Sequence, residues 1–120
     1  MNQNLNSKPY DLEERTLQFA KRTALYCKKL PKNTINIEYI RQVVRSSSSV
    51  GANYIEANES LGKKDFLMHI KICRKEAKES AYWLRLIIET NDRQFENEGK
   101  ELFQEAIEFK KIFSSMINKQ

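Results

Sequence analysis

The sequence has few of the residues that interrupt regular structure. It contains 3 glycines and 2 prolines among 120 residues, and a domain built from many short strands needs far more turn residues. Lysine, glutamate and leucine are frequent instead, which is typical of long helices. Hydrophobic residues make up 40% of the chain, enough for one buried core. We therefore expect a single all-α domain.

Long apolar runs and clustered cysteines are also lacking. No run approaches the ~18 apolar residues that a membrane span needs, and the N-terminal MNQNLNSKPY has no apolar signal core. The only cysteines, Cys27 and Cys73, fall in separate helical patterns. Clustered spacing is required for a zinc site or a disulfide framework, so we expect two reduced thiols, no metal, no cofactor and a cytoplasmic location.

Groups that would support catalysis are scarce. His69 is the only histidine, and it precedes Cys73 by four residues, the spacing of a Cys–His pair on one helix. Both residues flank a core stripe, so ordinary packing is the better interpretation. No glycine-rich phosphate loop occurs. The sequence predicts a protein that is not an enzyme, with turnover dependent on His69 or Cys73 as the distant alternative.

Apolar residues recur every three or four positions in four segments, which predicts four helices. The expected helices cover Asp11 to Lys29, Asn33 or Thr34 to Leu61-Gly62, Lys63 or Lys64 to Asn91-Asp92, and a fourth segment whose main face runs from Leu102 to Met116. Gly62 is expected to cap the second helix in a left-handed conformation. Short connections favour antiparallel neighbours. The prediction is an antiparallel up-down-up-down four-helix bundle over residues 10–120, after a disordered N-terminal tail at residues 1–9.

The run Arg45-Ser-Ser-Ser-Ser-Val-Gly has the composition of a flexible linker, yet the helical period continues through it. The expected core stripe on this second helix consists of Ile37, Ile40, Val44, Ser47, Gly51, Ile55 and Asn58. Small residues at Ser47 and Gly51 are expected to let helix backbones approach closely.

A second apolar track on the second and third helices predicts a subunit interface. Its members are Val43, Ser46, Val50 and Asn53 on the second helix and Met68, Ile72, Trp83 and Leu86 on the third. The track favours a homo-oligomer. The alternative is that Trp83 merely flanks a wide core.

Positive charge is concentrated on one line of the third helix. The chain has 21 lysines and arginines against 16 acids. Lys64, Lys71, Lys78 and Arg85 recur every seven residues with Arg74 and Lys75 alongside, and Lys21, Lys28 and Lys29 form a second basic group in the first helix. Seven residues make nearly two helical turns, so the line suits the phosphate backbone of RNA or DNA. The alternatives are a solvated face and an adaptor that binds one protein partner without nucleic acid.

Residues 45–57 resemble the hallmark segment of the bacterial four-helix-bundle proteins, also called 23S rRNA intervening-sequence proteins. Lys63-Lys-Asp-Phe66 and residues 75–84 resemble the third helix of that family, and the likeness extends over about residues 10–117. Ala57 stands where the family often has glycine. The family motif positions that fall on this chain are Arg45, Ser48, Asn53 and Glu56.

The resemblance implies a homopentameric ring and kinship with the accessory variability protein of diversity-generating retroelements. That protein is a basic pentamer that binds nucleic acid and a reverse transcriptase. Asn53 and Glu56 lie three residues apart near the edge of the core, so we expect them to hydrogen-bond to a neighbouring helix or subunit. A direct binding role for these two residues is the alternative.

Overall fold

The computed structural model describes residues 11–119, and all regular structure in that range is helical. The elements are α1 at Leu12–Lys29, α2 at Thr34–Asn58, α3 at Lys63–Thr90, a short 3-10 turn η3 at Arg93–Phe95, and α4 at Glu96–Asn118. The predicted all-α class is confirmed, and the helices lie close to their expected bounds. The tail predicted at residues 1–9 lies outside the described residues.

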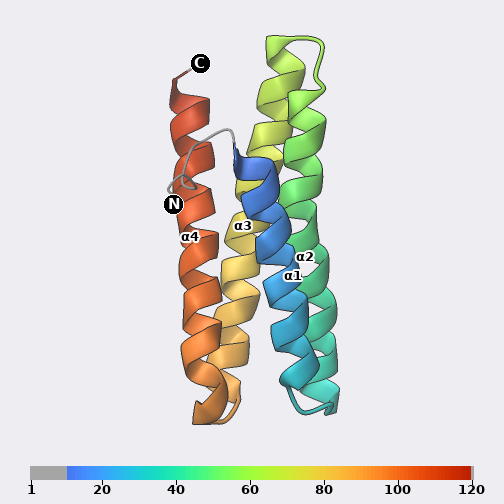
Figure 1. The fold of residues 1–120 in the computed structure, drawn as a ribbon, viewed down its shortest axis with the longest axis vertical. Helices are drawn as coiled ribbons and strands as arrows, with labels where there is room; N and C mark the ends of the chain where they lie inside the picture. The colour runs from blue at the N-terminus through green and yellow to red at the C-terminus, as the bar shows by residue number, and fades with distance from the viewer. Residues whose placement is uncertain (1–10, 120) are drawn as a thin grey trace, which may run out of the picture.

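Consecutive helices lie side by side and run in opposite directions, as in an up-down bundle (Figure 1). α1 and α3 each pack against α2 and α4, so they occupy diagonal positions. α1 has 18 residues and α3 has 28, and the α2–α3 hairpin extends beyond the start of α1 (Figure 1). Among the described residues, no helix is long and apolar enough to cross a membrane. The predicted bundle is confirmed, whereas the pentameric ring stays a prediction.

Local capping sets the helix ends. The ammonium group of Lys32 donates to three carbonyl oxygens at the end of α1. At the start of α2, the Asn33 side chain accepts the backbone N–H of Asn36 at 2.8 Å, as a helix N-cap does. The left-handed cap predicted at Gly62 is wrong, because α2 ends at Asn58 and Gly62 has an extended backbone with φ −156° at the start of α3.

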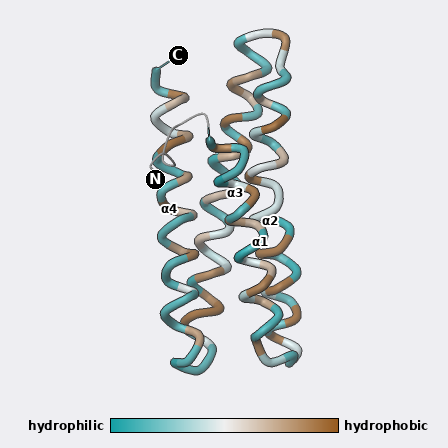
Figure 2. Tube along the Cα trace, in the orientation of Figure 1, coloured by the Kyte–Doolittle hydropathy of each residue, from teal (hydrophilic) through white to brown (hydrophobic). Residues whose placement is uncertain are grey.

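One hydrophobic core runs between the four helices. Its largest buried side chains include Phe19 and Tyr26 of α1 and Phe109 and Phe113 of α4, and the rings of Phe19 and Phe109 meet edge to face at 5.4 Å. Figure 2 shows the apolar residues recurring along the helices instead of gathering in one long run. The helical periodicity predicted for the first, third and fourth helices is confirmed, because their buried residues recur every three or four positions.

α2 is rotated relative to the prediction. Four positions expected in its core are exposed, namely Ile37 at 47%, Val44 at 36%, Ile55 at 47% and also Asn58. Val43, Ser46 and Val50, expected at a subunit interface, are fully buried within this one chain. Their assignment to an interface is wrong, because the second apolar track is the one that packs into the bundle.

Two close helix contacts explain this rotation. A Cβ atom at Gly51 would lie 2.8 Å from Thr16 Oγ1, so α1 approaches α2 where glycine leaves room. On the other side, the hydroxyl oxygens of Ser46 and Ser80 are 2.8 Å apart between α2 and α3. Small residues are required where helices come this close, and the branched aliphatic residues of α2 then lie outside. The close approach predicted at Gly51 is confirmed.

Candidate nucleic-acid interface

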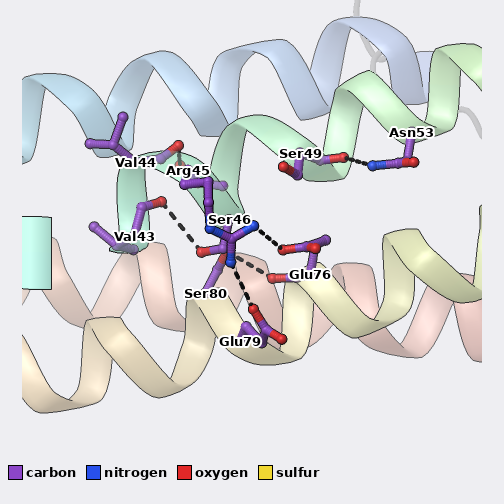
Figure 3. Close-up of polar contacts among 10 residues, drawn as sticks. Val43, Val44, Arg45, Ser46, Ser49, Asn53, Glu76, Glu79 and Ser80 are labelled. Atoms are coloured by element: carbon purple, nitrogen blue, oxygen red, sulfur yellow. Dashed lines mark hydrogen bonds and ion pairs between the residues drawn. The ribbon is translucent and has the colours of Figure 1, made fainter. Parts of the chain in front are cut away.

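The serine run lies in the middle of α2 and forms part of its contact with α3 (Figure 3). Ser46 and Ser80 are both fully buried, with 2.8 Å between their hydroxyl oxygens. Ser80 Oγ also lies 2.9 Å from the carbonyl oxygen of Glu76, and Ser46 Oγ lies 3.4 Å from that of Val43, so each hydroxyl has an acceptor whichever serine donates to the other. Both buried hydroxyl groups therefore have partners, and the contact fixes the register of α2 against α3.

Arg45 binds two acids of α3 (Figure 3). Its guanidinium nitrogens lie 3.4 Å from Glu76 Oε1 and 3.0 Å from Glu79 Oε1. The side chain of Glu76 is only 8% exposed, whereas that of Glu79 is 39% exposed. A buried carboxylate needs a compensating partner, so Arg45 stabilises Glu76 in the folded chain.

The line of positive charge predicted on the third helix lies where α3 borders α4. A hollow of about 370 Å³ is lined by Lys71, Arg74, Lys75 and Lys78 of α3 and by Lys110 and Ser114 of α4. A second hollow of about 770 Å³ at the start of α3 is lined by residues that include Lys64 and Lys71. Lys71 therefore joins the two hollows. We call the six cations Lys64, Lys71, Arg74, Lys75, Lys78 and Lys110 the basic face.

The cations of the basic face have no acidic partners. Among residues 11–119, no ion pair includes any of them. Unpaired like charges repel one another, and a bound anion with repeated charge relieves that repulsion. The basic face thus concentrates positive charge that no acid among the described residues pairs with.

Some cations elsewhere in the bundle are paired with acids, notably those between α1 and α4. Between α1 and α4 the pairs are Arg15 with Glu105, Arg22 with Glu101 and Lys29 with Glu98. The first of these is bidentate, with both bonds at 2.8 Å, and the hydrogen bonding to Glu105 raises the pKa of Arg15. These three cations of α1 therefore link α1 to α4 through ion pairs, whereas the cations of the basic face form no ion pair between helices.

Four predicted cations lie apart from the basic face. Lys21 and Lys28 are exposed on α1, and Lys29 pairs with an acid of α4. Because α1 is diagonal to α3 (Figure 1), the bundle does not bring these three lysines to the row. Arg85 stays on α3, but its Nε lies 2.7 Å from Glu89 Oε2, so its charge is already paired within the helix.

The remaining interface candidates on α3 lie at the margin of the core. Met68 is 50% exposed, and Ile72, Trp83 and Leu86 are partly buried. The ring of Trp83 packs beside Tyr39 of α2, with 6.1 Å between their centroids. Trp83 thus flanks the core and retains some exposed surface, and the role of these four residues in an interface stays a prediction.

The geometry gives no support for a Cys–His nucleophile. Cys73 is buried and its Sγ donates to the carbonyl oxygen of Val50 at 3.4 Å, and burial raises the pKa of its thiol to about 12. His69 Nε2 lies 3.6 Å from Asp65 Oδ1. Cys73 therefore stays protonated at neutral pH, unlike a reactive thiolate. Within residues 11–119, no group of three or more His, Cys, Asp or Glu side chains is placed to hold a metal ion.

The sequence over residues 9–115 matches the family described as 23S rRNA-intervening sequence protein. The chain belongs to this family. A solved structure from Bacteroides thetaiotaomicron VPI-5482, described as a protein with unknown function from the S23 ribosomal protein family, is 30% identical and has a TM-score of 0.77. The alignment covers 88% of this chain and 97% of that chain. No curated protein matches the sequence.

The family motif positions have different surroundings in this member of the 23S rRNA-intervening sequence proteins. Arg45 forms the ion pairs with Glu76 and Glu79 that are described above. Asn53 Nδ2 donates to the carbonyl oxygen of Ser49 in its own helix at 2.9 Å, so the expected bond to a neighbouring helix of this chain is wrong, whereas a bond to another subunit stays a prediction. Ser48 and Glu56 are exposed. The motif therefore combines a structural residue with residues on the outer surface.

Three residues near the basic row were missed by sequence pattern. Lys110 and Ser114 come from α4, and their approach to α3 depends on a helix rotation that one sequence does not specify. Tyr82 is 60% exposed and lies seven residues after Lys75. That heptad spacing was a usable signal, because it places Tyr82 on the line of the cations.

Proposed function

We propose that this chain is a non-enzymatic accessory protein that binds the phosphate backbone of RNA or DNA through the basic face. The observation that carries the proposal is the set of unpaired cations around the hollow between α3 and α4. Phosphate contacts of this kind require repeated positive charge and carry no sequence information by themselves. Binding is therefore expected to depend on salt and to show little preference for sequence.

Two further features support a backbone ligand. Lys71 and Lys78 are about 10 Å apart along the helix axis, so they contact separate phosphates of one strand. The resemblance to the accessory variability protein of diversity-generating retroelements, a basic protein that binds nucleic acid, favours the same class of ligand. A scaffold role is part of this proposal, because the protein brings no chemistry of its own to the nucleic acid.

The test compares two matched charge reversals. The variant Lys71→Glu/Lys78→Glu changes the basic face, and Lys21→Glu/Lys28→Glu changes α1 with the same charge and the same seven-residue spacing. Binding of a fluorescent oligonucleotide is measured by anisotropy between 50 and 200 mM salt. We expect the first variant to lose most of its affinity, with a slope of log K against log salt that is smaller by about 0.7–0.9 for each lost phosphate contact.

The Lys21→Glu/Lys28→Glu control distinguishes binding at the basic face from attraction by the net charge of the whole protein. If both variants weaken binding equally, net charge alone explains the affinity and the assignment to the basic face fails. A wild-type protein that binds no oligonucleotide at 50 mM salt contradicts the whole proposal. Capture of a single protein partner that survives nuclease treatment, in the absence of oligonucleotide binding, favours the alternative of a protein adaptor.

A separate proposal concerns assembly with further copies of this chain. α2 exposes a stripe of branched aliphatic side chains at Ile37, Val44 and Ile55, and solvent exposure of such a stripe is costly unless a partner covers it. The stripe replaces Val43, Ser46 and Val50 as the interface candidate on α2. A homo-oligomer, with the pentameric ring implied by the resemblance, is the assembly that we propose.

Light scattering tests this assembly. Wild-type protein is expected to have a mass several times that of the 14.2 kDa chain, and Val44→Glu/Ile55→Glu is expected to release monomers because it places charge in the contact. Leu25→Glu is the control, since Leu25 is 54% exposed on α1. A monomeric wild type, or equal disruption by the control, contradicts the proposed surface.

A further inference from the structure

An exposed aromatic ring lies next to the basic face. Tyr82 is 60% exposed, although its ring is large and apolar. It follows Lys75 by seven residues and Lys78 by four, so it lies on the same line of α3, about 6 Å along the axis from Lys78. The basic face thus ends at a side chain that offers an aromatic surface to solvent.

The neighbouring tryptophan holds this ring. The centroids of Tyr82 and Trp83 are 5.3 Å apart with an interplanar angle of 75°, and Trp83 in turn packs beside Tyr39 of α2. An edge-to-face contact restricts the orientation of a ring, while the exposed fraction shows that most of Tyr82 remains free. A restricted, exposed ring loses little conformational freedom when a flat ligand stacks on it.

Resting on the function proposed above, we propose that Tyr82 stacks on an unpaired base while Lys75 and Lys78 contact the adjacent phosphates. The preferred ligand is therefore single-stranded RNA or DNA. Bases within a duplex have both faces covered by their neighbours, whereas an unpaired base exposes a face to an aromatic side chain. Arg85 contributes less, because Glu89 already neutralises it.

The experiment measures the affinity of full-length protein for a 20-nucleotide single strand and for a 20-base-pair duplex under the same low salt. Tyr82→Ala is expected to weaken single-strand binding by about 5- to 150-fold, which corresponds to the loss of one stacked base. Duplex binding is expected to change less than about twofold, and the salt slope to stay the same, because phosphate contacts are retained. Tyr82→Phe keeps the ring and is expected to bind like wild type.

Leu25→Ala is the matched control, since it removes an exposed apolar side chain from the distant α1. Circular dichroism of each variant verifies that the helices are intact. Equal weakening of single-strand and duplex binding by Tyr82→Ala, or a Tyr82→Phe variant as weak as Tyr82→Ala, overturns the stacking role. A wild type that binds both ligands while Tyr82→Ala changes neither overturns this inference but leaves the proposed function standing. A wild type that binds neither ligand overturns both.

Discussion

Replacing Arg45 by methionine tests which carboxylate of α3 depends on it. Methionine retains most of the apolar stem of arginine and removes only the charge. Glu79 makes the shorter contact, at 3.0 Å against 3.4 Å for Glu76. Burial nevertheless makes Glu76 the dependent partner, because its side chain is 8% exposed and that of Glu79 is 39% exposed.

The expected cost of Arg45→Met is intermediate between two known limits. Removing one partner of a fully buried ion pair costs about 3–5 kcal/mol, and an exposed pair contributes about 0.2–1 kcal/mol. Here one partner is buried and the guanidinium side chain is 52% exposed. We therefore expect a loss of about 2 kcal/mol in the free energy of unfolding, which lowers the melting temperature of a domain this size by about 8 °C.

Second substitutions identify the residue responsible for the loss. Arg45→Met/Glu76→Gln removes the buried charge as well and is expected to return to within about 1 kcal/mol of wild type, since an uncharged amide costs less to bury. Arg45→Met/Glu79→Gln is expected to remain as unstable as the single variant, because Glu79 is solvated. Urea unfolding is followed by circular dichroism at one protein concentration, which keeps any contribution from assembly constant. Equal rescue by both second substitutions, or a loss below about 0.5 kcal/mol for Arg45→Met, refutes the reasoning.

Three further predictions concern the core. Gly51→Ala places a methyl group 2.8 Å from Thr16 Oγ1, and we expect a net loss of about 1 kcal/mol in denaturant unfolding after the gain in helix propensity; adding Thr16→Ala should restore stability. Burial raises the pKa of Tyr26 to about 12. The unfolded chain therefore loses this proton before the folded chain does, and the free energy of unfolding should fall between about pH 10 and pH 12. A Tyr26→Phe variant should lack this fall, so the slope of its unfolding free energy against pH should be smaller by up to ~1.4 kcal/mol per pH unit. Phe109→Ala should cost about 3–5 kcal/mol, because its ring is fully buried, and a loss below 1 kcal/mol would contradict its place in the core.

The sequence predicted the buried sides of α1, α3 and α4 because their apolar residues recur with a helical period. Phe19 of α1, Leu84 of α3 and Phe113 of α4 are fully buried. Periodicity and residue size agree at these positions, so either signal finds the buried side. The connections between helices are short, which made the up-down arrangement predictable as well.

The same approach failed on α2, where residue size and burial disagree. This helix buries the small Ser46 and exposes the larger Val44, because its contact with α3 is close. Both faces of α2 have helical periodicity, and the larger residues favoured the wrong one. Seven-residue spacing does not distinguish the two faces, since Val43 and Val50 have it on the buried face and Ile37 and Val44 have it on the exposed face. The burial of Glu76 had no local signal, since it depends on Arg45 from another helix.

The serine run of α2 contacts one side of α3, and the basic face lies on the opposite side of the same part of α3. Over residues 75–82, one side of α3 binds α2 through Ser80 and Glu76, and the other carries Lys75, Lys78 and Tyr82. A ligand site gains from side chains mounted on an element that does not shift when the ligand binds. The buried contact to α2 supplies that rigidity without using any cation of the basic face. What has the composition of a linker is therefore the part of α2 that holds the proposed binding helix in place.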